Sequence, residues 1–158
     1  FMKNHNLNIY NNLIKLTRNK LLFKKLNNQD SFYDRIIVFF IHFAFFLKIY
    51  KGNQSKKNLQ KLYDFVFNQI NISLGEAGHG ETTINKKMKN YVNIFHLIIK
   101  KIELWESLNK DEKSNFFSSF FKQSIESAYF VEYFEKYRIF LANNTLNHFT
   151  KDVISLKF

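Results

Sequence analysis

The chain carries apolar residues at helical spacing over most of its length. From Ser55 to Leu74 they recur at i, i+3, i+4 and i+7, the pattern of an amphipathic helix. The same period continues through residues 82–108, 111–121 and 130–141, and strand-like alternation persists nowhere. The pattern therefore predicts an all-α fold, a single compact domain of six or seven helices.

One predicted helix, from about Ser31 to Tyr50, is apolar on nearly every side. Within residues 36–47 the only polar side chain is His42. Because a membrane-spanning helix needs about 20 apolar residues, a shorter run with charges close to both ends favours a buried core helix. A surface that contacts a membrane is the alternative interpretation. We expect the other helices to pack around this apolar central helix, with His42 as a hydrogen-bonded core imidazole.

The pattern of residues 1–30 predicts a basic amphipathic N-terminal helix. We expect residues 31–158 to form a separate helical domain. An imperfect apolar stripe runs over about 6–26, and no acidic residue precedes Asp30. Such a helix fits an arm that contacts a membrane surface or ribosomal RNA. An edge helix with a solvated basic face is the other interpretation.

Glycine marks the main loop. Three of the four glycines lie within residues 75–81, between two strong helical patterns, and such a segment predicts a loop with unusual backbone torsions. Thr82 or Thr83 can cap the helix that follows. The short tail at 147–158 offers a few apolar side chains for packing.

Composition supports long helices and raises the question of a charged partner. The chain has 20 Phe, 4 Gly and no Pro, so bulky rings must fill the interior and turn-forming residues are few. Its 24 basic and 13 acidic residues give a formal net charge of +11, which suits an anionic partner such as RNA, a ribosome surface or a membrane face. A codon bias toward Lys and Asn explains the same charge without a functional cause.

The residues needed for catalysis or metal binding do not occur at suitable spacing. There is no Cys, and the five histidines form no metal-binding pair. No nucleophile lies at a recognisable spacing from a base, and we expect Glu132 and Glu135 to lie on the wet face of a helix. We therefore predict a protein that is not an enzyme, with no catalytic or metal-binding residues, no cofactor and no small-molecule substrate.

From about Phe32 onward the chain resembles the ubiquinol-cytochrome c chaperone family. The similarity lies in short segments before, within and after the glycine-rich loop: Tyr33-Asp34-Arg35, Leu62-Tyr63-Asp64, Ser73-Leu74-Gly75-Glu76, Gly78-His79-Gly80-Glu81 and Ile84-Asn85-Lys86-Lys87-Met88-Lys89. Family members often carry Arg where this chain has Lys86, Lys87 and Lys89. Lysine keeps the charge but loses the bidentate geometry of a guanidinium. The start at Met2 favours a bacterial-type member.

The resemblance implies a non-catalytic assembly chaperone that binds newly made cytochrome b, or another membrane-protein client, as respiratory complex III assembles. We expect it in the cytoplasm, peripheral on the inner face of the cytoplasmic membrane, or on the matrix side in a mitochondrion. The partner-binding candidates lie in one segment: Gly78, His79, Gly80, Glu81, Lys86, Lys87, Lys89, Tyr91 and Phe95. An apolar groove for a client helix would use Tyr91, Phe95, Trp105, Phe130 and Phe134, unless these rings are simply core.

A second hypothesis is an RNA- or ribosome-binding helical module without a client. Lys86, Lys87 and Lys89, with Lys100 and Lys101 further along, could neutralise several phosphates. No known nucleic-acid-binding motif accompanies them, however, and a run of lysines is most often a solvated face.

Overall fold

The computed structural model describes residues 2–26, 31–121 and 125–150, and this part of the chain is helical throughout with no β-strand. Six of its α-helices have 11 residues or more, which confirms the predicted all-α class. Two 3₁₀ turns, Lys51–Asn53 and Trp105–Ser107, connect longer helices. The α-helices are α1 Met2–Thr17, α2 Lys20–Lys24, α3 Phe32–Tyr50, α4 Lys56–Glu76, α5 Glu81–Glu103, α6 Lys110–Phe120, α7 Ser127–Ala142 and α8 Asn147–Thr150.

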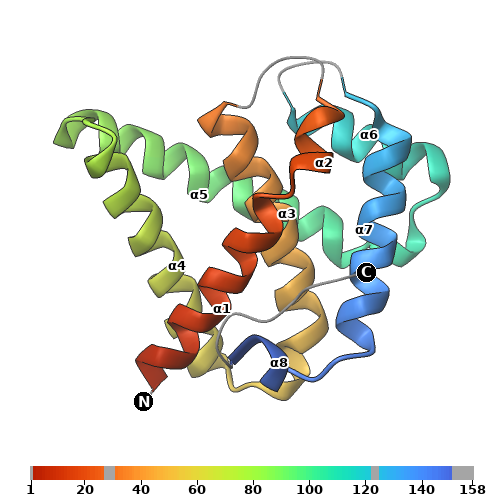
Figure 1. Cartoon of the computed structure of the whole chain (residues 1–158), viewed down its shortest axis with the longest axis horizontal. Helices are drawn as coiled ribbons and strands as arrows, with labels where there is room; N and C mark the ends of the chain where they lie inside the picture. The colour runs from red at the N-terminus through yellow and green to blue at the C-terminus, as the bar shows by residue number, and fades with distance from the viewer. Residues whose placement is uncertain (1, 27–30, 122–124, 151–158) are drawn as a thin grey trace.

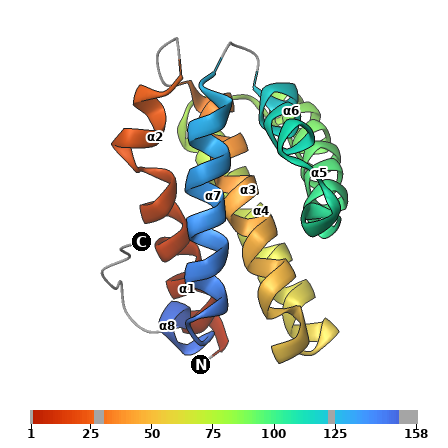
Figure 2. The same cartoon turned by 90° about the vertical axis from the view of Figure 1, so that its right-hand side faces the viewer.

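Helix α3 runs through the middle of the molecule, with α1, α5 and α7 packed against it (Figures 1 and 2). Every residue from 36 to 46 is buried, so the predicted apolar central helix is confirmed. Its start is fixed by Ser31, whose hydroxyl accepts a hydrogen bond from the Asp34 N–H at 3.1 Å. Among the described residues, no helix combines the length and the apolar character that crossing a bilayer requires.

Aromatic rings fill the space around α3. Phe43 stacks on Phe95 of α5, with ring centroids 5.3 Å apart, and Phe45 stacks on Phe134 of α7 at 5.8 Å. Each fully buried phenylalanine contributes about 1.5–3 kcal/mol relative to an exposed one, and aromatic pairs add to this. The phenylalanine-rich composition therefore serves the core.

The N-terminal segment differs in detail from the single helix expected over residues 6–26. It forms α1 and α2, with a break at Arg18 and Asn19. The break has a local cause, because the Asn19 side chain accepts a hydrogen bond from the Leu21 N–H at 2.9 Å and so starts a new helix. Leu13 of α1 is completely buried in the core that surrounds α3. The proposed domain boundary at residue 30 lies outside the described residues and stays a prediction.

The end of the chain has one clear anchor. Phe149 of α8 is buried and packs against Phe46 of α3, with ring centroids 5.1 Å apart. The Asn8 and Asn12 side chains of α1 donate hydrogen bonds to the carbonyls of Thr150 and Phe149. The rest of the predicted tail, residues 151–158, lies outside the described residues.

Candidate partner-binding surface

The loop between α4 and α5, residues 75–81, is hereafter the tip loop, and it lies at one end of the molecule (Figure 1). The Gly78 N–H donates to the Gly75 carbonyl at 3.0 Å, and the His79 N–H donates to the Leu74 carbonyl at 3.2 Å. This pair of bonds is a Schellman motif, which ends a helix with one residue in the left-handed region. Gly78 has a φ of 91° there, so the expected unusual torsion is confirmed.

Helix α5 begins immediately after the tip loop. Gly80 is its N-cap residue, with extended backbone, and its carbonyl accepts a hydrogen bond from the Ile84 N–H at 2.9 Å. The prediction that Thr82 or Thr83 caps this helix was therefore wrong. The Schellman turn ends at Gly78, and α5 begins at Glu81. Only His79 and Gly80 lie between them.

The candidate residues of the tip loop and of the first turns of α5 are accessible to a partner. Six are exposed and Lys87 is half-buried. The exposed ones are Gly78, His79, Gly80, Glu81, Lys86 and Lys89.

Tyr91 and Phe95 instead point into the core, with exposed fractions of 4% and 0%. The Phe95 ring lies 5.0 Å from that of Phe40, and Tyr91 packs edge-on against the same Phe40 ring. These two side chains therefore stabilise the attachment of α5 to α3 and offer no groove in this structure. The other rings considered for a groove are also fully buried: Trp105, Phe130 and Phe134.

One side of α5 is basic, and its residues share a helical face by spacing. We call it the α5 basic face. It carries four lysines, no acidic residue and two exposed leucines, Leu97 at 53% and Leu104 at 62%. Its members are Lys86, Lys89, Asn90, Asn93, Leu97, Lys100, Lys101 and Leu104. The leucines were missed by the sequence analysis, although apolar residues on the polar side of an amphipathic pattern are a usable signal.

The lysines of the α5 basic face differ from five described lysines on other elements. Lys25, Lys48, Lys51, Lys113 and Lys136 each form an ion pair with a glutamate. No ion pair between described residues involves a lysine of α5. The positive charge of this face is therefore not neutralised within the described part of the chain.

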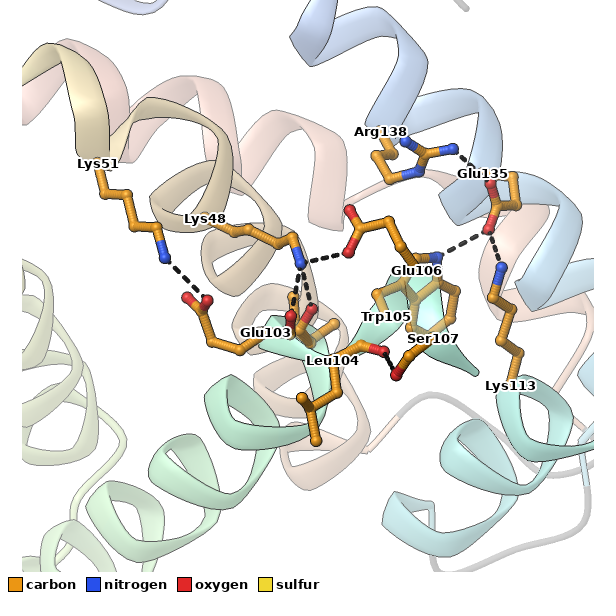
Figure 3. Close-up of polar contacts among 11 residues, drawn as sticks. Lys48, Lys51, Glu103, Leu104, Trp105, Glu106, Ser107, Lys113, Glu135 and Arg138 are labelled. Atoms are coloured by element: carbon orange, nitrogen blue, oxygen red, sulfur yellow. Dashed lines mark hydrogen bonds and ion pairs between the residues drawn. The ribbon is translucent and has the colours of Figure 1, made fainter. Parts of the chain in front are cut away.

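The far end of α5 is held by Lys48 of α3 (Figure 3). Its ammonium donates hydrogen bonds to the carbonyls of Ile102 and Glu103 and to the carboxylate of Glu106, at 3.0, 2.8 and 2.7 Å. The last carbonyls of a helix lack partners within the helix, and a lysine is a suitable donor for them. Helix α5 thus ends at Glu103, with its last carbonyls satisfied by Lys48, and not near residue 108 as expected.

Glu135 of α7 collects three donors (Figure 3). It accepts hydrogen bonds from the Trp105 indole at 2.7 Å, the Lys113 ammonium at 2.9 Å and the Arg138 guanidinium at 3.1 Å. Partial burial acts to raise the pKa of Glu135, but these hydrogen bonds outweigh it and the pKa is lowered. The expectation that Glu135 is merely solvated was wrong, whereas Glu132 is exposed as expected. Glu135 therefore fixes α6 and the turn after α5 to α7.

His42 is completely buried and fully hydrogen-bonded, as predicted. Its Nδ1 lies 2.7 Å from the Val38 carbonyl, which can only accept, so Nδ1 carries the proton. Nε2 then accepts from the Tyr133 hydroxyl at 2.8 Å. Burial lowers the pKa of His42 to about 3, against a weaker opposing effect of the Val38 carbonyl. A neutral imidazole with both nitrogens engaged is a structural group.

The described residues hold no group of three or more His, Asp or Glu side chains placed to bind a metal ion. Among the exposed histidines, His96 lies with its Nε2 3.2 Å from the Tyr63 hydroxyl. The polar clusters of Figure 3 join helices to one another. The arrangement is that of a packed helical body with an exposed basic face.

Comparison with known proteins identifies the family. The model of the ubiquinol-cytochrome C chaperone family matches residues 24–112, which include α3, α4, the tip loop and α5. Searches of curated proteins and of solved structures returned no significant match. The match covers more than half of the chain, and membership of a chaperone family implies a non-catalytic role with a client protein. The chain belongs to the ubiquinol-cytochrome C chaperone family.

Proposed function

We propose that this protein binds newly made cytochrome b at a membrane surface while respiratory complex III is assembled, and that the tip loop and the α5 basic face are the contact surface. The observation that carries the proposal is that the family match spans both features. A client that is a membrane protein is surrounded by lipid head groups, so its chaperone must approach an anionic surface.

The chemistry of the α5 basic face supports this role. Leu97 and Leu104 are exposed beside Lys100 and Lys101 on one side of a long helix. Exposed apolar side chains flanked by lysines are typical of helices that lie on a membrane surface, where each lysine contributes about 1 kcal/mol near anionic lipid. We propose that the protein works peripherally on the inner face of the membrane, with this face toward the lipid or toward the client.

The test is a crosslinking pull-down of tagged protein from its native membranes, with the recovered proteins identified by mass spectrometry. The variant neutralises three exposed lysines of the α5 basic face, Lys86, Lys89 and Lys100, together by substitution with Gln. A matched control neutralises three α4 lysines that are also exposed and form no ion pair with a described residue: Lys56, Lys57 and Lys61. Both variants lose the same charge, so only the position differs.

We expect the wild type and the α4 control to recover cytochrome b, and the α5 variant to lose most of it. Equal recovery by both variants would remove the α5 basic face from the proposal. Recovery of no membrane protein by the wild type would contradict the client role itself.

The RNA- or ribosome-binding alternative makes a different prediction from the same lysines. Affinity for RNA would fall steeply with salt, and neutralising three phosphate-contacting lysines would reduce the slope of log K against log salt by about 2 to 3. Filter binding of ribosomal RNA at several salt concentrations measures this slope. A flat response in the wild type would exclude the alternative.

A further inference from the structure

A groove of about 300 Å³ lies between the C-terminal end of α5 and helix α6 (Figure 2). We call it the α5–α6 groove. Its apolar lining consists of Leu104, Leu108 and Phe116. Leu104 has the largest exposed fraction of any large apolar side chain among the described residues, 62%. Because a cavity of about 150 Å³ holds a benzene ring, the groove has room for about two apolar side chains.

Contacts to the core hold the α6 side of the groove in place. The Trp105 ring packs edge-on against Phe116, with ring centroids 5.6 Å apart, and Phe116 is only 3% exposed. The next ring, Phe117, stacks on Phe134 of α7 at 5.4 Å. The groove is therefore bounded by packed helices, and a partner that enters it pays little for ordering them.

The two walls of the groove carry opposite charges. On the α5 side, Lys101 lines the groove, and Lys100 lies beside it on the α5 basic face. Neither lysine forms an ion pair with a described residue. On the α6 side, the charged lining residue is Glu112. Its carboxylate accepts a hydrogen bond from the Asn109 N–H at 3.0 Å, which keeps it at the first turn of α6.

Exposed apolar surface continues from the groove along α5. Leu97 precedes Leu104 by seven residues, so both lie on one side of the helix, about 10 Å apart along its axis. Leu97 is 53% exposed. Helices that bind in grooves present apolar residues at i, i+3 or i+4, and i+7, and this spacing matches the distance from Leu97 to the groove.

We propose that the α5–α6 groove receives one amphipathic helix of a partner protein. Two of its apolar residues fill the groove, a third contacts Leu97, and acidic residues on one flank face Lys100 and Lys101. A neutral or basic residue on the other flank faces Glu112. The groove adjoins the proposed contact surface, but the inference does not require the partner to be cytochrome b.

The charges of the two walls favour a helix over two other occupants. An anionic membrane is attracted by Lys100 and Lys101 but repelled by Glu112 on the opposite wall. Two copies of this chain that met through the α5 basic face would place lysines against lysines. A helix presents different residues on its two flanks, so it can match both walls at once.

The experiment measures binding of labelled synthetic peptides to the full chain by fluorescence anisotropy at physiological salt. The acidic probe is an amphipathic helix of about 18 residues, with leucine at i, i+4, i+7 and i+11, glutamate on one flank and glutamine on the other. The basic probe has lysine in place of each glutamate, and a third probe has alanine in place of each leucine. We expect the acidic probe to bind about tenfold more tightly than either of the others.

One pair of variants tests the apolar part of the groove. Leu104→Gln removes the exposed leucine, and its control, Ile139→Gln, changes a 51% exposed side chain of α7 outside the groove. We expect Leu104→Gln to bind the acidic probe about tenfold more weakly than the wild type, and Ile139→Gln to bind it equally well.

A second pair tests the charge. The variant combines Lys100→Gln with Lys101→Gln, and the control combines Lys57→Gln with Lys61→Gln, which removes the same charge from exposed positions of α4. We expect the first to lose about tenfold in affinity for the acidic probe and the control to lose none. All substituted side chains are exposed, and circular dichroism verifies that each variant is folded.

No binding of the acidic probe at millimolar concentration would overturn the inference. Equal binding of the acidic and basic probes would also overturn it, as would a loss in a control equal to that in its variant. The other occupants are tested by flotation with phosphatidylcholine–phosphatidylglycerol vesicles and by sedimentation equilibrium. Vesicle binding or self-association that Leu104→Gln abolishes, without binding of the acidic probe, would assign the groove to lipid or to a second copy. None of these assays contains cytochrome b, so their failure is distinguishable from failure of the pull-down.

Discussion

The buried His42 makes the stability of this protein depend on pH, and the effect can be calculated from its surroundings. The imidazole is neutral in the folded state, since burial lowers its pKa to about 3. In the unfolded chain it returns to its ordinary pKa of 6.5. The groups that face it from α7 are the phenols of Tyr133 and Tyr137, and burial raises the pKa of both. These phenols therefore remain neutral below pH 8.

The sign follows from proton binding. Between pH 6.5 and about pH 3 the unfolded state binds a proton at His42 and the folded state does not, so acid favours unfolding. The contribution of His42 is fully present above pH 6.5 and is lost as the pH falls below it, by up to about 1.4 kcal/mol per unit. Between pH 8 and pH 5 the loss amounts to about 2 kcal/mol.

The assay is urea unfolding at pH 8, 7, 6 and 5, followed by the fluorescence of Trp105, the single tryptophan of the chain. The comparison protein is His42→Gln, because a glutamine amide can donate to the Val38 carbonyl and accept from Tyr133 but does not titrate. Other titrating groups act equally in both proteins. We expect the wild type to lose about 2 kcal/mol more than the variant between pH 8 and pH 5.

Parallel pH profiles for the two proteins would refute the reasoning. They would mean either that the folded imidazole accepts a proton readily or that the unfolded chain also shields it. An NMR titration of the His42 ring protons in the folded protein decides between these, because a ring that titrates near pH 6 is not desolvated.

Three further substitutions test other contacts by urea unfolding. Gly78→Ala should lower the free energy of unfolding by about 1 kcal/mol, because alanine is strained at positive φ. Gly80→Ser should raise the free energy of unfolding by about 0.5 kcal/mol, because it adds an N-cap hydroxyl. A loss of stability in both variants would contradict the assigned torsions. Glu135→Ala should cost about 2–3 kcal/mol and shift the Trp105 emission, since the buried indole loses its acceptor, and an unchanged spectrum would argue against that bond. Lys48→Met should cost about 1–2 kcal/mol and speed amide hydrogen exchange around the C-terminal turn of α5, and unchanged exchange would contradict the capping role.

Sequence reasoning succeeded where a local pattern decides the structure. The long apolar run predicts α3 and its burial, Ser31 and Ser55 mark two helix starts, and the glycines mark the tip loop. Each signal lies within a few residues of the feature that it predicts.

The rest depends on contacts between distant residues. Lys48 caps a helix that ends 55 positions later, and Glu135 meets an indole 30 positions earlier, so no local pattern reveals either. Tyr91 and Phe95 follow the same helical period whether they line a groove or a core. Only the position of α3 against α5 shows that they are core.

Because the chain is synthesised from its N-terminus, α3 is made well before some of the helices that bury it. The helix covers residues 32–50, yet two of the helices packed against it, α5 and α7, end at residues 103 and 142. At a synthesis rate of about 5–20 residues per second, α7 is completed roughly 5 to 20 s after α3. Until then the most apolar stretch of the chain lacks its last covering helix. During that time it can associate with other nascent chains. A member of a chaperone family therefore itself exposes its most apolar helix early in its own synthesis.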